Sequence, residues 1–293
     1  MIKIIVPATS ANIGPGFDSL GVALNLYLTL EIHEETNFWV VDHDFENAMP
    51  HDATHFIVKT ALSLAPNITP HHIIVKSDIP LARGLGSSSS ALLAGLAMAN
   101  VLADLKLSDE LLLEHATKLE EHPDNVAPAL FGGGIAAYYD GLRLYHAPLK
   151  LPDFVDFITF IPNYKLLTSA ARAALPQNLS FKESVAASAI SNTLIAALYA
   201  DDFVTARELI EQDHFHETAR ADLVPHLAVI RRIAHDLDIT GTYLSGAGPT
   251  IITIVPKNQS TDLLLALSKA NLPGQIHRLQ QDFNGLTIMK EEK

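Results

Sequence analysis

The spacing of hydrophobic residues in the first 80 positions changes between two periods, which predicts a mixture of strands and helices. Short apolar or alternating runs over 2–6, 22–31, 37–45 and 72–79 are typical of strands. Between them, apolar residues at positions 57, 58, 61, 62 and 64 have helical spacing, so we expect a helix over 54–65.

The rest of the first half is read in the same way. In chain order we expect a helix over 91–105, a helix over 109–121, a loop over 122–134 and a hairpin over 135–148. The first helix is rich in Ala and Leu without proline, and Ser108 is a good N-cap for the second. Asp140-Gly141 is a typical pair for the turn of the hairpin.

Proline residues near 148–152 suggest a boundary, and a second set of elements follows. We expect a strand over 154–163, helices near 182–200, 202–213 and 224–237, two strands around a glycine loop within 241–255, a helix near 261–270 and a closing strand near 285–290. The pattern predicts an α+β fold of two domains, 1–152 and 153–293.

Composition narrows the class of protein. The chain has 293 residues, 48% of them hydrophobic, which is enough for two cores. Its formal net charge of −13, without any basic run, argues against nucleic-acid binding. It has no cysteine, no signal-peptide pattern, and no apolar run of the roughly 20 residues that a membrane span needs. We therefore expect a cytoplasmic protein without membrane contact, and a homodimer is among the assemblies that the sequence allows.

The segment "PLARGLGSSSS" (80–90) runs directly into the predicted helix over 91–105. A glycine loop that leads into a helix N-terminus presents free N–H groups and the positive end of the helix dipole to an anion. It is not a Walker A loop, because no Gly-Lys-Ser/Thr follows the glycines. A flexible linker that ends in an N-cap is the alternative.

Three further clusters carry polar groups beside glycine or proline. "ANIGPGFDSLG" (11–21) holds Asn12 and Asp18, and "EEHPDNVAPALFGG" (120–133) holds a carboxylate, an imidazole and an amide within six residues. "LSGAGPT" (244–250) is a second glycine loop. Each could alone be a structural turn whose polar side chains cap backbone N–H groups; together they indicate a site.

These four clusters resemble the motifs of the GHMP kinase superfamily, and within it the homoserine kinase family. The resemblance spans residues 6–255, and "LLTSAARAALP" (166–176) is also similar to a substrate loop of that family. It implies a ribosomal S5-like N-terminal domain, a ferredoxin-like C-terminal domain, and transfer of phosphate from ATP, with Mg²⁺, to the hydroxyl of L-homoserine in threonine biosynthesis. The glycine loops at 80–90 and 246–249 should then face one shared cleft.

The resemblance also implies roles for individual residues. The nucleotide-binding set is Pro80, Leu81, Ala82, Arg83, Gly84, Leu85, Gly86, Ser87, Ser88, Ser89 and Ser90. The metal ligands are Ser88 and Glu120, and the catalytic set is Glu120, His122 and Asn125. The substrate-binding set is Asn12, Asp18, His122, Asp124, Asn125, Thr168, Arg172, Arg220 and Gly246.

Within that scheme, charge decides the substrate contacts. Asp18 and Asp124 suit an ammonium group, and Arg172 and Arg220 suit a carboxylate. Asn125 stands where other superfamily members carry an aspartate base, so the hydroxyl should lose its proton to phosphate or solvent.

Some positions depart from the family pattern. Glu121 replaces a usual glycine, and His55-Phe56 replaces a usual Asn-Leu near the base. The pairs His71-His72 and His214/His216 lack a metal-binding frame and are expected at the surface. Two other functions stay open: a superfamily kinase acting on an isoprenoid precursor, and a nucleotide-binding regulator without catalysis.

Overall fold

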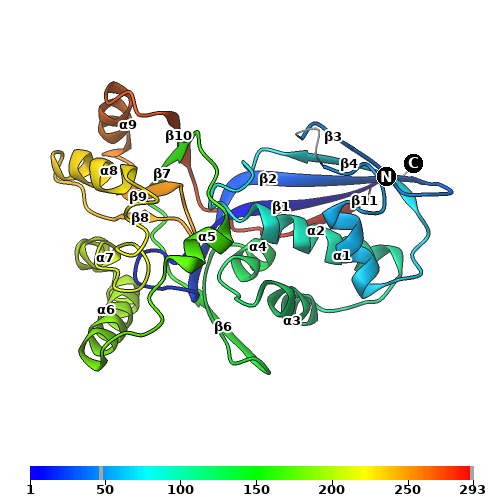
Figure 1. Ribbon diagram of the computed structural model, residues 1–293, viewed down its shortest axis with the longest axis horizontal. Helices are drawn as coiled ribbons and strands as arrows, with labels where there is room; N and C mark the ends of the chain where they lie inside the picture. The colour runs from blue at the N-terminus through cyan, green and yellow to red at the C-terminus, as the bar shows by residue number, and fades with distance from the viewer. Residues whose placement is uncertain (46–48, 291–293) are drawn as a thin grey trace.

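The computed structural model describes residues 1–45 and 49–290, which form two sheets with helices packed against them (Figure 1). The first half contains β1 (Ile2–Ala11), β2 (Leu20–Glu35), β3 (Val40–His43), α1 (Phe56–Leu64), β4 (His71–Ser77), α2 (Ser87–Leu102), α3 (Asp109–Glu120), α4 (Val126–Phe131), β5 (Gly134–Tyr139) and β6 (Leu144–Leu149). The second half contains β7 (Val155–Pro162), α5 (Thr168–Ala173), α6 (Phe181–Tyr199), α7 (Phe203–Ile210), α8 (His226–His235), β8 (Thr242–Leu244), β9 (Ile251–Pro256), α9 (Ser260–Lys269), β10 (Gly274–Leu279) and β11 (Thr287–Lys290).

The first sheet has the order β11-β1-β2-β4-β3, with β5 paired to β2 and β6 paired to β5. Helices α1, α2 and α4 lie along one side of it in Figure 1, and α2 packs directly on β1. Nearly every residue of α2 from Ser89 to Ala99 is buried, because this Ala- and Leu-rich helix has sheet on one side and α1, α3 and α4 on others. The N-terminus of α2 is therefore held on a rigid layer.

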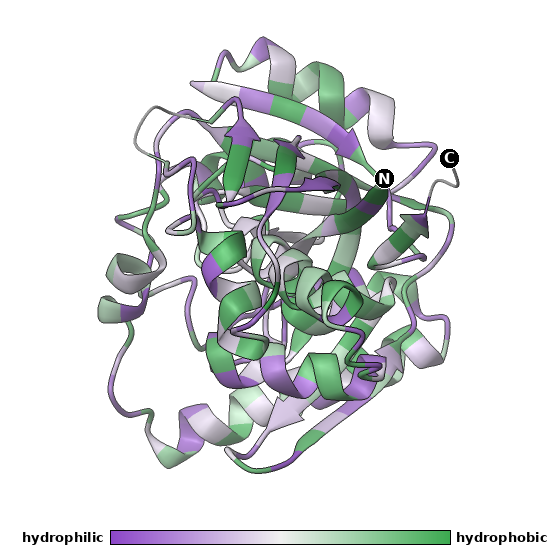
Figure 2. Cartoon of the chain, turned by 90° about the vertical axis from the view of Figure 1, so that its right-hand side faces the viewer, coloured by the Kyte–Doolittle hydropathy of each residue, from purple (hydrophilic) through white to green (hydrophobic). Residues whose placement is uncertain are grey.

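The second sheet has the order β10-β7-β9-β8 and is antiparallel throughout. Strand, helices, two strands, helix and strand follow one another in the β-α-β-β-α-β order of the ferredoxin-like plan. Hydrophobic and hydrophilic residues alternate along the strands and helices in Figure 2, as expected for elements with one face on a core.

The end of the chain returns to the first sheet, where β11 pairs with β1 in antiparallel register. The predicted boundary at residue 152 falls between β6 and β7, but the predicted segment 153–293 contributes this last strand to the other half. A crossing of this kind has no local signal, because the paired residues lie at opposite ends of the chain: Ile2 pairs with Lys290 and Ile5 with Thr287.

Several local predictions were wrong. The four serines belong to the first turn of α2, because Gly86 in the left-handed region (φ 69°) starts the helix before them. The predicted loop 122–134 contains α4, whose Pro128 lies in the first turn, where a missing N–H does no harm. Strand β10 was missed because it is an edge strand with mostly half-exposed, polar residues.

Among the described residues, no helix is both long and apolar enough to cross a membrane.

Candidate active site

A cleft of about 380 Å³ lies where the two halves meet, at the N-terminus of α2. Its walls come from segments far apart in the sequence: the loop after β1, the start of α2, the α3–α4 turn, α5 and the loop between β8 and β9. We call the part formed by Gly84, Gly86 and Ser87–Ser89 the helix end, and the part formed by Asp18, His122, Asp124, Arg172 and Arg220 the charged end.

The helix end presents backbone rather than side chains. The N-cap of α2 is Gly86, so no side chain caps the first N–H groups of the helix. A Cβ at this position would collide with Thr9 Oγ1, so only glycine fits here. The uncapped N–H groups and the positive end of the dipole face the cleft, and this geometry favours an anion.

The two glycine loops meet, which confirms the predicted shared cleft. Ser245 Oγ donates to Gly84 O at 2.6 Å, and a Cβ on Gly84 would lie 2.5 Å from Ser245 O. Ser10 Oγ is 2.8 Å from Ser245 Oγ, so β1, the α2 loop and the β8–β9 loop are joined by adjacent hydrogen bonds.

Part of the predicted nucleotide-binding set points elsewhere. Ala82, Gly84, Gly86 and Ser87–Ser89 line the cleft, whereas Pro80, Arg83, Leu85 and Ser90 do not. Arg83 donates to Pro162 O at 2.9 Å and to Asn163 O at 2.8 Å, so its guanidinium ties the loop to the end of β7. Ser90 is buried and its hydroxyl donates to Pro7 O at 2.8 Å.

A second pocket of about 380 Å³ adjoins the cleft and shares Ala82, Ser87 and Ser88 with it. Leu81 and the pair His55-Phe56 line it, together with apolar residues of β2, β4 and α2. Phe56 is 47% exposed and lies at the mouth, whereas His55 is buried and its Nδ1 accepts from Ile57 N to cap α1. Burial lowers the pKa of His55 from 6.5 to about 4, and the nearby His43 and His51 add to this.

The adjacent glutamates at the end of α3 differ in direction. Glu120 lines the cleft and its Oε1 accepts a hydrogen bond from Ser89 Oγ at 2.7 Å. Glu121 is exposed, and as the C-cap in the left-handed region (φ 71°) it turns away. Of the two, the geometry favours Glu120 as the residue that could hold a cation beside Ser88 and Ser89.

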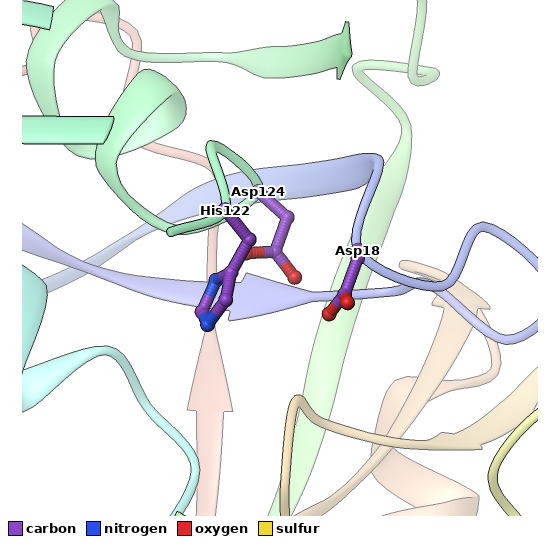
Figure 3. Close-up of side chains that lie close together, drawn as sticks. All are labelled: Asp18, His122 and Asp124. Carbon is purple, nitrogen blue, oxygen red and sulfur yellow. The ribbon is translucent and has the colours of Figure 1, made fainter. Parts of the chain in front are cut away.

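Figure 3 shows Asp18, His122 and Asp124 facing one another at the charged end, from the loop after β1 and the α3–α4 turn. One ligand atom of each lies within 4.8 Å of the others. His122 Nδ1 is 2.9 Å from Asp124 Oδ1. Burial alone would lower the pKa of His122, but this hydrogen bond and the charge of Asp124 raise it instead. The cluster suits a cation, either an ammonium group or a metal ion.

The two predicted arginines both reach the charged end. Arg172 donates to Asp18 through Nη1 at 3.3 Å and Nη2 at 3.1 Å, as a fork. Arg220 is only 2% exposed and donates to Ala171 O and Gly246 O at 3.1 and 3.0 Å. Burial, reinforced by the charge of Arg172, lowers the pKa of Arg220 to about 10, so it stays charged at neutral pH.

The remaining predicted residues shape the walls. Asn12 Oδ1 accepts from Asp18 N at 3.0 Å and its Nδ2 donates to Gly246 O at 3.1 Å, so its side chain holds the loop. Asn125 Oδ1 accepts from Thr9 Oγ1 at 2.8 Å. Thr168, at the start of α5, lines the cleft and is exposed.

Sequence reasoning missed Thr9, Phe17 and His216. The expectation of surface histidines was wrong for His216, which is wholly buried, and for His71, which is 9% exposed. Asp213 accepts from His216 N at 2.7 Å and turns this segment inward. An Asp three residues before a histidine is a recognisable turn signal, but it does not tell which way the histidine points.

Comparisons with known proteins find relatives over nearly the whole chain. The family model for the GHMP kinases N terminal domain matches residues 55–133, and that for GHMP kinases C terminal matches 194–273. The homoserine kinase of Leuconostoc mesenteroides is 69% identical over 290 residues, covering 99% of each chain. The solved structure of a homoserine kinase homologue from Listeria monocytogenes has a TM-score of 0.89 and 42% identity, covering 99% of this chain and 100% of that one.

Mevalonate kinase of L. major, in complex with R-mevalonate, shares the fold at a TM-score of 0.74 but only 16% identity over 97% of this chain and 96% of that one. A two-domain kinase fold with a helix N-terminus at a shared cleft defines the class as the GHMP kinases. Within that class, the chain belongs to the homoserine kinase family.

Proposed function

We propose that this chain transfers the γ-phosphoryl group of ATP to the hydroxyl of L-homoserine. The observation that carries the proposal is the cleft itself, which joins an uncapped helix N-terminus to a cluster of two arginines and two aspartates. Homoserine is a zwitterion with a terminal hydroxyl, and that cluster offers charges of both signs. An isoprenoid acid such as mevalonate has no ammonium group for Asp18 and Asp124.

The nucleotide is bound mainly by backbone and apolar surface. The N–H groups at the start of α2 hold the phosphates, since no side chain caps them. The apolar pocket beside Ser87 and Ser88 is open to the base, with Phe56 at its mouth. Helix end and pocket share residues, so one nucleotide can span both.

The residues beside the phosphates suit Mg²⁺. Glu120 offers a carboxylate and Ser88 a hydroxyl, which are the hard oxygen ligands that this ion prefers. Ser89 donates to Glu120 and would orient its free oxygen. When bound, the ion would neutralise charge on the phosphate oxygens.

Substrate binding follows the charges. The ammonium group binds between Asp18 and Asp124, with His122 holding Asp124 in place. The carboxylate binds Arg172 and the free edge of Arg220. Without substrate, Arg172 and Asp18 pair with each other. When the zwitterion binds, its carboxylate takes the place of Asp18 beside Arg172, and its ammonium group takes the place of Arg172 beside Asp18.

The proton of the substrate hydroxyl needs no carboxylate base. Asn125 occupies the wall of the cleft near the phosphates, and an amide can orient a hydroxyl but cannot accept its proton. In a loose phosphoryl-transfer transition state the proton can leave late, to phosphate or solvent. A kcat–pH limb that vanished in Asn125→Ala would contradict this.

A coupled ADP-release assay with homoserine and with mevalonate tests the proposal. We expect turnover with homoserine and none above background with mevalonate. Turnover with mevalonate alone would assign the chain to isoprenoid metabolism. Nucleotide binding without turnover on either would make it a regulator.

A further inference from the structure

His216 is a buried histidine that no part of the reaction described above uses. It lies on the segment that carries Arg220 and contacts the loop after β1, so it joins two of the segments that form the charged end. Its side chain is 0% exposed, and its ring stacks on Phe17 at 5.3 Å between centroids. A polar ring enclosed in this way must have partners for both nitrogens, because an unpaired buried nitrogen is costly.

Both nitrogens have such partners, and the partners fix the tautomer. Nδ1 lies 3.2 Å from Arg220 Nη1, which can only donate, so Nδ1 is the acceptor. Nε2 lies 3.1 Å from Gly14 O, which can only accept, so Nε2 carries the proton. A proton on Nδ1 would face a guanidinium N–H. Burial lowers the pKa of His216, and the charge of Arg220 opposes that of Asp213, whose Oδ1 is 3.8 Å from Nε2.

Arg220 is held at several points and leaves one edge for a ligand. Nε donates to Ala171 O, and Nη1 serves both Gly246 O and His216. Nη2 has no hydrogen-bond partner among the described residues. Asn12 also donates to Gly246 O, so the same carbonyl ties Arg220 to the loop that ends in Asp18.

We propose that His216 is a positioning residue, whose neutral imidazole fixes Arg220 relative to the loop that carries Asp18. It thereby sets the spacing between the carboxylate and ammonium sites of the substrate. The inference rests on the proposed function, because it assigns the arginine to the substrate carboxylate. It explains why a histidine rather than an apolar residue fills this buried position.

The test compares His216→Phe with the wild type on homoserine and on 3-amino-1-propanol, which lacks the carboxylate. Phe keeps the ring and its stacking on Phe17 but loses both hydrogen bonds. We expect kcat/KM for homoserine to fall about 10- to 100-fold, mainly through KM, because Arg220 loses one of the buried hydrogen bonds that position it. The KM for ATP and the activity on 3-amino-1-propanol should stay within about twofold.

Two conservative variants separate the two hydrogen bonds. His216→Asn can place an oxygen where Nδ1 was and should restore part of the homoserine activity through Arg220. His216→Gln can place its amide N–H where Nε2 was and should restore less. The exposed His214, two residues away, supplies the control: His214→Phe should match the wild type on both substrates.

An equal loss of His216→Phe on both substrates would overturn the inference and make His216 structural. Should the variants not fold, imidazole ¹⁵N spectra of the wild type still decide: a bare Nδ1 and a protonated Nε2 near neutral pH support it, and the reverse overturns it. If the wild type does not phosphorylate homoserine, the proposed function fails by itself, independently of that spectrum.

Discussion

The helix end and the charged end of the cleft differ in what presents their binding groups. At the helix end, backbone N–H groups of one well-packed helix do so, and glycine at position 86 leaves them without a side-chain cap. At the charged end, ionisable side chains come from the loop after β1, the α3–α4 turn, α5 and the segment before α8. The helix end needs one rigid element, whereas the charged end needs several elements held in fixed positions relative to one another.

This difference explains what each end can do. Backbone N–H groups bind phosphate whatever is attached to it, so the helix end suits phosphoryl transfer in general and does not select the acceptor. Charged groups at fixed spacing discriminate between substrates, because a substrate that lacks one of the matching charges leaves a buried charged group of the protein unpaired. Substitutions at the two ends should therefore separate the kinetic constants for ATP from those for homoserine.

The largest effect is expected at the junction of the two ends. Under the proposed function, Glu120→Gln should lower kcat on the order of 10³-fold, because it would weaken the binding of Mg²⁺ beside the phosphates, while the KM for homoserine barely changes. Glu121→Gln is the matched control and should be nearly silent, since Glu121 is exposed. Loss of turnover in Glu121→Gln but not in Glu120→Gln would show that Glu121, and not Glu120, acts in the cleft.

The charged end should respond next. Arg172→Ala or Arg220→Ala should cost about 2–4 kcal/mol, or roughly 30- to 1,000-fold in kcat/KM for homoserine, with ATP affinity nearly constant. Lysine should rescue only partly, because it supplies charge without the planar fork. Arg232→Ala, on the exposed side of α8, is the control. If the arginine variants raised the KM for ATP as much as the KM for homoserine, the two ends would not bind their ligands independently.

Substitution at the helix end should raise the KM for ATP rather than that for homoserine, by a smaller factor. Gly86→Ala places a Cβ against Thr9 at a positive φ, which should shift the N-terminus of α2 and raise the KM for ATP about tenfold. Gly141→Ala carries similar backbone strain (φ 92°) where a Cβ meets no atom within 4 Å, so it should leave both KM values unchanged. A larger rise for homoserine than for ATP in Gly86→Ala would contradict the division.

The last effect concerns the second pocket, which His55 lines, and it appears in stability rather than in catalysis. The folded-state pKa of His55, about 4, lies below its ordinary value of 6.5, so protonation favours the unfolded chain. Its contribution to stability is present above pH 6.5 and is lost as the pH falls toward 4. His55→Asn keeps an N-cap for α1 but does not titrate. Between pH 7 and 5, the free energy of unfolding of this variant should therefore fall by about 2 kcal/mol less than that of the wild type. Parallel losses in denaturant titrations would contradict it.

The sequence revealed the two ends to different depths. The helix end was predictable from local chemistry, because glycines before an Ala- and Leu-rich helix dictate an anion site at its N-terminus, although the start of α2 was placed four residues late. The contact between Arg172 and Asp18 joins residues 154 positions apart, and only the family resemblance placed both of them, with Arg220, at one site.

The sequence could not reveal how the residues that support the two ends are oriented. The direction of His216 and the use of Arg83 as a tie to β7 depend on the packing of the second half against the first. The return of β11 to the first sheet has the same origin, since pairing over such a distance leaves no local pattern.

The central claim is that the arginines of the charged end recognise the carboxylate of an amino-acid substrate in the cleft that holds the phosphates. The most direct test measures kcat/KM of wild type and Arg172→Ala on homoserine and on 3-amino-1-propanol. Wild type should prefer homoserine by on the order of 100-fold, and Arg172→Ala should reduce that preference to a few-fold by losing activity on homoserine alone. If Arg172→Ala weakens both substrates equally, the preference does not come from the arginine and the account is contradicted.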